Sequence, residues 1–192
     1  MNPPDQDFVS AMRDLIGVLQ ADYKGMIIGG MAVIALGYPR VTTDIDATVL
    51  AAPDRLDSLV ERLGTHHILP RIEKAADFAR SHHVLLMRHQ PSGIDIDITM
   101  AMLPFEEEAI AHRQPADFAG VRIFIPKAED LVIYKIVASR PDDLRDVEEL
   151  LLRHFDKIDF RRVRSIVKQF ADALERPEMT RDLEALIKKA EK

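Results

Sequence analysis

Hydrophobic residues recur at helical spacing near the start of the chain. The apolar stripe of segment 7–20 consists of Phe8, Met12, Leu15, Ile16 and Leu19. Polar residues of the same segment, such as Arg13 and Asp14, fall away from that stripe. An apolar stripe with this period is typical of an amphipathic helix that covers a core with one face. We therefore predict that the chain opens with such a helix.

Short apolar runs and turn residues alternate in the following segment. Gly37 stands before Pro39, which cannot continue a helix, and Pro53 and Gly64 are typical of a helix start and a helix end. The predicted order is a buried strand over 25–28, a tight turn at Gly29-Gly30, a helix over 31–37, a strand over 43–50 and a helix over 52–64.

Two hairpins and a series of helices come next. Segments 83–90 and 94–100 flank a turn at 91–93, and segment 117–125 predicts a second hairpin. The acidic run from Glu106 to Glu108 favours a helix that opens after Pro104. Beyond Pro126, helical spacing predicts helices over 127–138, 141–154, 159–174 and 180–192.

This order of elements predicts an α+β fold, with a mixed sheet flanked by helices and a C-terminal helical part. The chain of 192 residues is long enough to bury a core. We find no internal repeat, low-complexity tract or linker rich in Gly or Ser, so we predict only a soft boundary near Pro126. It separates a core of residues 1–126 from a helical region of residues 127–192 that packs on this core.

Composition narrows the class of protein. Lys and Arg number 26 against 32 Asp and Glu, a formal charge of −6, so an RNA contact would have to be local. The absence of Cys excludes disulfides and thiolate metal ligands. Segment 1–8 is acidic where an export signal would be basic, and the apolar segment 25–38 is shorter than the roughly 20 residues of a membrane helix. We expect a cytoplasmic protein with no membrane partner.

Two pairs of aspartates stand on predicted strands in the pattern Asp-x-Asp. Residues two apart on a strand face the same side. Asp44 and Asp46 therefore share one face of the first strand, and Asp95, Asp97 and Thr99 share one face of the second. Two carboxylates about 4 Å apart repel by roughly 4 kcal/mol at an effective dielectric constant near 20. Mg²⁺, or Mn²⁺ in its place, relieves such repulsion and is commonly held by one or two carboxylates together with substrate phosphates.

Each of these motifs also has a purely structural explanation. Aspartates can keep strand edges soluble. Gly29-Gly30 can be a plain strand-to-helix turn rather than a helix start that takes up a phosphate. The G-x-G-x-x-G spacing of a Rossmann fold does not occur here. The combination of a glycine pair, an acidic pair and a later acidic strand favours the metal and phosphate interpretation.

These residues, read together with the helices that follow, resemble the nucleotidyltransferase superfamily, which has the DNA polymerase β-like fold. Arg40 and Thr42 stand ahead of the first acidic pair, as in that superfamily. Within it, the chain looks most like the AbiEii-like, toxin-like minimal nucleotidyltransferases. Their helical lysine and following acidic motif are matched by Lys135, Arg140, Asp143 and Asp146. The resemblance covers about residues 27–151 and implies that residues 1–126 form the catalytic core.

The resemblance implies a role for each matched residue. The metal ligands would be Asp44, Asp46 and Asp97, and the catalytic set adds Lys135. The nucleotide-binding set would be Gly29, Gly30, Arg40, Thr42, Lys135, Asp143 and Asp146. Asp95 shares the face of Asp97 and is the alternative third ligand. Lys135 would reach the nucleotide phosphates as a point charge, and Asp143 or Asp146 would orient it or assist the acceptor.

Some of these features have simpler explanations. Asp142 stands where many relatives have Lys or Arg, and segment 140–146 also fits an ordinary helix N-terminus. Lys135 also fits a lysine whose stem lies along an apolar helix rim. The pairs His66-His67 and His82-His83 lack metal-ligand spacing and are interpreted as solvated loop residues. A basic group could touch an RNA backbone but fits a solvated helix face better: Arg161, Arg162, Arg164 and Lys168.

The sequence thus predicts an Mg²⁺-dependent nucleotidyltransferase of the EC 2.7.7 type, which moves a nucleoside monophosphate from an NTP such as ATP to an acceptor. RNA such as tRNA, a protein and a small molecule all stay open as acceptors. The toxin-like resemblance implies a toxin of a toxin–antitoxin pair, with a cognate antitoxin as partner. One alternative is a catalytically degenerate nucleotide-binding or interaction module of such a pair. The other is an antibiotic-modifying adenylyltransferase.

Overall fold

A computed structural model of the chain describes residues 6–191. Its helices are α1 (Gln6–Ala21), α2 (Gly29–Ala35), α3 (Leu56–Gly64), α4 (Ala75–His82), α5 (Pro104–Ala111), α6 (Ala128–Ala138), α7 (Pro141–His154), α8 (Phe160–Ala173) and α9 (Glu178–Ala190), with 3₁₀ turns η1 (Pro53–Arg55) and η2 (Phe155–Lys157). Its strands are β1 (Lys24–Ile27), β2 (Asp44–Leu50), β3 (Ile68–Pro70), β4 (Val84–His89), β5 (Asp95–Met100), β6 (Gln114–Phe118) and β7 (Val121–Ile125).

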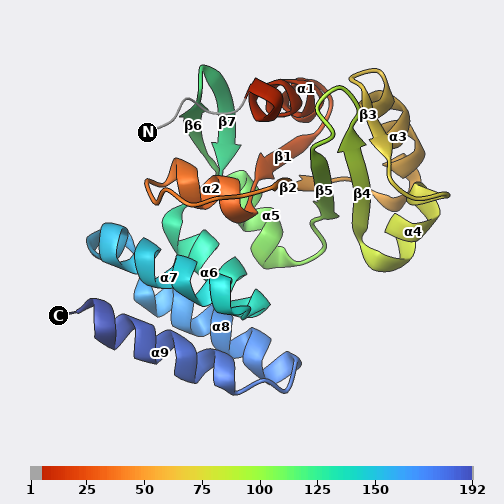
Figure 1. Cartoon of the computed structure of the whole chain (residues 1–192). Coiled ribbons are helices and arrows are strands. Elements are labelled where there is room, and N and C mark those ends of the chain that lie inside the picture. Colours follow the sequence, from red (N-terminus) through yellow and green to blue (C-terminus); the bar gives the residue numbers. More distant parts are fainter. Residues whose placement is uncertain (1–5, 192) are drawn as a thin grey trace.

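Five strands form the main sheet in the order β1-β2-β5-β4-β3, and β6 and β7 form a separate hairpin (Figure 1). β2 and β5 run parallel, whereas the other neighbouring strands of this sheet are antiparallel. The tight turn between β4 and β5 permits only antiparallel pairing, while the long connection from β2 to β5 allows a parallel pair. The fold is therefore α+β with a mixed sheet, as the sequence predicts.

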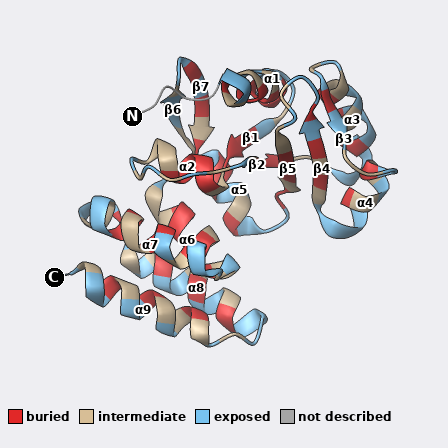
Figure 2. Cartoon of the chain, viewed as in Figure 1, coloured by how far each residue is buried: buried red, intermediate tan, exposed pale blue. Residues whose placement is uncertain are grey.

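One face of the sheet is covered by apolar side chains. Those of Ile45, Ala47 and Val49 on β2 and of Ile96 and Ile98 on β5 are fully buried. Figure 2 shows buried residues along these strands and on the inner faces of the surrounding helices. The alternation of side chains along a strand then directs the intervening aspartates to the opposite face, beside α2.

The helices α6 to α9 pack on one another below the sheet in the view of Figure 1, and α2 lies between this group and β2. The acidic face of the sheet is thus close to α6 and α7. A domain division near Pro126 stays a prediction. None of the helices described over residues 6–191 has the length and apolar character needed to cross a bilayer.

The structure differs from the predicted elements in three places. α2 begins at Gly29, so the glycine pair forms the first turn of the helix instead of preceding it. β3 and α4 were not predicted, because β3 has only three residues and ends in Pro70, and α4 is short and polar. Residues 1–5 of the acidic segment 1–8, and the last residue of the final predicted helix, lie outside the described residues.

The acidic strands lie inside the sheet. β2 pairs with β1 and β5, and β5 pairs with β2 and β4. Neither strand is an edge strand, so the explanation that their aspartates keep sheet edges soluble is wrong.

Candidate active site

The parallel pairing of β2 and β5 places four aspartates side by side. Asp44 is opposite Asp95, and Asp46 is opposite Asp97. Like charges directly opposite each other on neighbouring strands destabilise a sheet. Four carboxylates in this arrangement therefore need cations, and the two strands obtain them differently.

The aspartates of β5 are neutralised by arginines of the chain itself. Arg88 Nε donates to Asp95 Oδ1 at 2.6 Å, and Arg71 Nη1 donates to Asp95 Oδ2 at 2.9 Å. The hydrogen bond from Arg88, aided by Arg71, lowers the pKa of Asp95. Arg71 Nη2 also donates to Asp97 Oδ1. Asp97 has no partner other than Arg71 among the described residues, and burial raises its pKa in spite of that arginine. Asp95 is thus committed to ion pairs, whereas Asp97 keeps one oxygen free.

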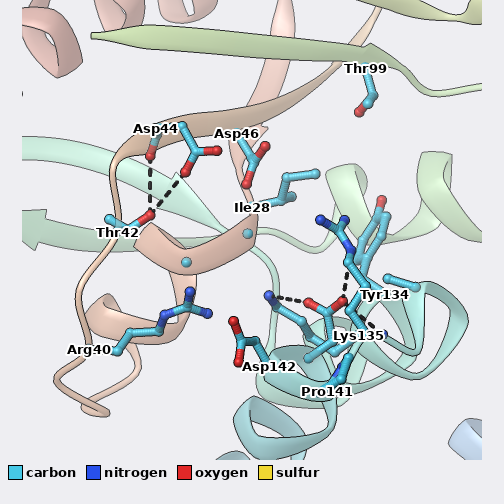
Figure 3. A pocket seen from close by; sticks show the side chains of 15 residues that line it. Ile28, Arg40, Thr42, Asp44, Asp46, Thr99, Tyr134, Lys135, Pro141 and Asp142 are labelled. Atoms are coloured by element: carbon cyan, nitrogen blue, oxygen red, sulfur yellow. Dashed lines mark hydrogen bonds and ion pairs between the residues drawn. The ribbon is translucent and has the colours of Figure 1, made fainter.

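The aspartates of β2 have no such partners. Asp44 Oδ1 accepts a hydrogen bond from Thr42 Oγ1 at 3.2 Å, and no cation pairs with it among residues 6–191. The carboxylate of Asp46 makes no hydrogen bond or ion pair with any described residue (Figure 3). Burial, together with the charges of Asp44 and Asp97, raises the pKa of Asp46 to about 6. The β2 pair is therefore open to a cation from outside the chain.

Gly29 and Gly30 let the start of α2 approach this open pair. A Cβ at Gly29 would lie 1.9 Å from Asp46 Oδ2, and a Cβ at Gly30 would lie 2.8 Å from Thr42 Oγ1. Gly29 also has a φ of +61°, a conformation that other residues rarely adopt. The glycine pair is thus more than a plain turn, because any larger residue would displace the carboxylate beside it.

We expect Gly29→Ala to lower the catalytic rate about a hundredfold. The new methyl group must push Asp46 aside, and a displacement near 1 Å can cost that much. Gly93→Ala is the matched control, since Gly93 also has a positive φ, +71°, but open space around its Cβ position. Both variants should lose roughly 1 kcal/mol of stability through backbone strain, measured by thermal unfolding. Unchanged activity in Gly29→Ala would contradict the role of this close approach.

A cluster of four charged side chains, three of them buried, lies across the pocket from the open pair. Lys135 Nζ is 2.9 Å from Asp143 Oδ1 and 2.8 Å from Asp146 Oδ2. Arg40 Nη1, from the loop before β2, lies 2.5 Å from the same Asp146 oxygen. The whole Lys135 residue is only 7% exposed, so the explanation of a lysine with its ammonium at a helix rim is wrong. The cluster holds Arg40 and Lys135 at the pocket, where they can meet an anion.

The start of α7 combines an ordinary helix N-terminus with this cluster. Pro141 occupies the first turn, and Asp143 Oδ2 accepts a hydrogen bond from the backbone N–H of Arg140 at 3.3 Å. The other oxygen of Asp143 binds Lys135. Asp142 pairs with Arg145. The helix-start explanation is thus correct for Asp143 but does not account for its contact with Lys135.

These groups line one pocket with a volume of about 580 Å³. Figure 3 shows Asp44 and Asp46 on one wall, with Arg40 and Lys135 across from them. Most predicted site residues line it, namely Gly29, Gly30, Arg40, Thr42, Asp44, Asp46, Lys135 and Asp143. Asp146 does not line the pocket itself but forms ion pairs with the lining residues Arg40 and Lys135. Asp97 is not part of the lining either. Sequence reasoning missed Thr99 and Tyr134 as lining residues; only the strand alternation pointed to Thr99.

The remaining groups that the sequence singles out do not add to this pocket. Over residues 6–191, no three His, Cys, Asp or Glu side chains form a group arranged to hold a metal ion by themselves. On α8, three of the four basic side chains are paired with acids: Arg162 with Asp130 and Glu108, Arg164 with Glu184, and Lys168 with Asp172. These pairs leave little free positive charge on that helix.

Comparison with solved structures shows the same fold in several proteins, nucleotidyltransferases among them. The chain superposes on ANT(2'')-Ia, solved in complex with adenylyl-2''-tobramycin, with a TM-score of 0.58 and 15% identity over 88% of this chain and 98% of that one. The superposition on JHP933 from Helicobacter pylori has a TM-score of 0.53 and 16% identity, and it covers 99% of this chain and 95% of that one. For an antigenic nucleotidyltransferase-like protein from Paracoccidioides brasiliensis, the TM-score is 0.51 and the identity 14%, over 93% of this chain and 92% of that one. At these identities the likeness establishes the fold alone.

The fold is that of nucleotidyltransferases, and the open acidic pair Asp44 and Asp46 is consistent with this class of protein. The chain belongs to the family described as "Nucleotidyltransferase of unknown function (DUF6036)", whose model matches residues 8–191. A search of curated proteins finds no match.

Proposed function

We propose that this protein is an Mg²⁺-dependent nucleotidyltransferase that moves a nucleoside monophosphate from an NTP to an acceptor and releases pyrophosphate. One observation carries the proposal: the uncompensated pair Asp44 and Asp46 faces the cations Arg40 and Lys135 across a single pocket. A triphosphate with its divalent cation has the complementary charge pattern.

The donor set of this pocket fits a hard divalent cation. Asp44 and Asp46 supply carboxylate oxygens, and the raised pKa of Asp46 reflects repulsion that a cation relieves. Two carboxylates with substrate phosphates are an ordinary Mg²⁺ environment, and Mn²⁺ suits the same ligands. When bound there, the ion supplies charge neutralisation at the transferring phosphorus and the leaving group. Asp97, with its free oxygen, is the proposed third ligand.

The other residues of the pocket bind and orient the nucleotide. Lys135 and Arg40, held by Asp146, are proposed to contact the phosphates as fixed charges, so no reorganisation is needed on binding. The Gly29-Gly30 turn would let the phosphates approach the backbone of α2. Thr42 orients Asp44 through its hydroxyl group. Catalysis in this scheme rests on positioning and electrostatics, with no covalent intermediate on the protein.

The acceptor is a separate part of the proposal. An RNA acceptor such as tRNA, a protein and a small molecule all fit the chemistry, and a toxin with a cognate antitoxin is one biological setting for it. The paired cations of α8 disfavour that helix as an RNA surface. The fold shared with ANT(2'')-Ia supports a small-molecule acceptor, in the manner of an antibiotic-modifying enzyme.

The test is transfer of label from nucleotide. Purified protein is incubated with Mg²⁺, each α-labelled NTP in turn, total RNA and lysate, beside an Asp44→Ala/Asp46→Ala variant. We expect one RNA, protein or small-molecule product to carry label, with one preferred base, only when both aspartates are intact. Nucleotide binding without any transfer would instead favour the degenerate interaction module. Equal labelling by the double variant would exclude the proposed site.

A further inference from the structure

Arg71 lies outside the pocket lining but donates a hydrogen bond to Asp97, the proposed third metal ligand. We propose that Arg71 is a positioning residue for nucleotidyl transfer, which fixes the carboxylate of Asp97 so that its free oxygen serves the reaction centre. This inference rests on the proposed function and adds a residue that the sequence motifs did not contain.

The backbone around Arg71 is well anchored. Arg71 follows β3, and its N–H donates to the carbonyl of Leu86 on β4 at 2.9 Å. Three residues later, Lys74 adopts a left-handed conformation, with φ of 53°, directly before α4. The side chain of Arg71 is 24% exposed. The backbone of Arg71 is thus tied to β4, which pairs with β5 in the sheet.

The guanidinium group bridges two carboxylates on the same strand face. Nη1 donates to Asp95 Oδ2 at 2.9 Å, and Nη2 donates to Asp97 Oδ1. Asp95 is fixed from its other side by Arg88. Arg88, Asp95, Arg71 and Asp97 thus form a continuous chain of ion pairs that ends at Asp97. The planar fork of arginine can make both contacts at once, which a lysine ammonium does less well.

This series of ion pairs leaves Asp97 with one carboxylate oxygen bound by Arg71 and one oxygen available. Oδ2 of Asp97 has no hydrogen-bond partner among the described residues, and Asp97 is opposite Asp46 in the strand register. Without Arg71, Asp97 would face the charges of Asp44, Asp46 and Asp95 with no cation of its own. We expect it then to rotate away, since the repulsion is no longer offset.

The position of Arg71 predicts which kinetic constant changes. The proposed phosphate contacts, Arg40 and Lys135, come from other elements and do not touch Arg71. Loss of Arg71 should therefore lower kcat while KM for the NTP stays nearly constant. This pattern is typical of an interaction that matters mainly in the transition state. A merely structural role would instead reduce the amount of folded enzyme or change both constants.

The experiment compares Arg71→Gln, Arg71→Lys and Arg71→Ala with wild type in the labelling assay. We expect kcat to fall about 30-fold in Arg71→Gln and about 10-fold in Arg71→Lys, with KM changed less than about threefold. Millimolar guanidinium, but not equal KCl, should restore part of the rate of Arg71→Ala. Arg80→Gln is the control, because Arg80 likewise bridges two aspartates, Asp57 and Asp77, and none of these three residues lines the pocket. It should keep the wild-type rate.

The outcomes separate this inference from the proposed function. An active wild type whose kcat is unchanged in Arg71→Gln would overturn the positioning role alone. A fall in rate that guanidinium does not restore and that matches the loss of folded protein by thermal unfolding would also overturn it. A wild type that transfers no nucleotide, while Asp44→Ala/Asp46→Ala behaves identically, would overturn the proposed function and this inference with it.

Discussion

Asp46→Asn is expected to abolish nucleotidyl transfer and, at the same time, to make the metal-free protein more stable at neutral pH. Asp46 is buried beside Asp44 and Asp97, and its pKa is raised from 3.8 to about 6. Above pH 6 its charge therefore opposes folding. Asparagine has the shape of the protonated acid without the charge, so the variant avoids this cost.

The sign of the effect follows from proton linkage. A carboxyl whose pKa is higher in the folded state binds protons more tightly there, so the contribution of Asp46 to stability is fully present below pH 4 and is lost as the pH rises through 6. A pKa difference of about two corresponds to roughly 3 kcal/mol, an upper figure for the gain in Asp46→Asn at pH 7.5. Near pH 4 the two proteins should be equally stable. The catalytic loss should be at least on the order of a thousandfold, which leaves turnover near background, since one carboxylate of the proposed metal pair is removed.

Thermal unfolding in EDTA between pH 4 and pH 8 measures the stability difference. Asp95→Asn is the matched control with the opposite sign, because Asp95 has a lowered pKa and loses its bonds to Arg88 and Arg71. Addition of Mg²⁺ should raise the melting temperature of wild type more than that of Asp46→Asn. If Asp46→Asn were less stable than wild type at pH 7.5 in EDTA, the repulsion described for the open pair would be refuted.

Lys135→Met is expected to destabilise the protein by about 3 kcal/mol and to weaken NTP binding at least tenfold. Removal of Lys135 leaves the side chains of Asp143 and Asp146, 8% and 3% exposed, without their common cation. Breaking a buried ion pair by removing one partner costs about 3 to 5 kcal/mol. The contacts of Asp146 with Arg40 and of Asp143 with Arg140 keep the loss near the lower end.

Two comparisons identify the cause of this loss. Lys168→Met removes a lysine paired with Asp172 on the exposed face of α8, where an ion pair contributes less than about 0.5 kcal/mol. Lys135→Met combined with Asp143→Asn and Asp146→Asn should recover much of the stability, because no buried charge is left unpaired. Recovery of NTP affinity is not expected in the triple variant. Urea denaturation and nucleotide titration measure the two quantities, and a stable Lys135→Met protein would show that the cluster is dispensable for folding.

Most residues of the candidate site could be predicted because they obey short-range rules. Asp44 and Asp46 stand two apart on an apolar strand, so their common face follows from the geometry of a strand alone. The glycine pair, Lys135 and the acids of α7 were found by resemblance to a motif with regular spacing. All predicted site residues except Asp97 and Asp146 line the pocket.

The ion pairs that organise the site could not be predicted, because they depend on the pairing of distant segments. Arg71 belongs to an irregular segment after a strand of three residues, and nothing nearby in the sequence relates it to Asp97. The choice between Asp95 and Asp97 was likewise open, since both share a face. Only the positions of Arg71 and Arg88 distinguish them, and β3, which brings Arg71 close to β5, was itself missed.

Arg40 and Asp146 are separated by 106 residues of the chain, and this separation has a consequence during synthesis. The ribosome completes the sheet and its aspartates before it has made α7. A nascent chain at that stage carries the carboxylates but lacks Asp146, which holds Arg40 and Lys135 in place. In the proposed function, nucleotide binding would therefore begin only after α7 has emerged, and unfinished chains would not act on NTPs.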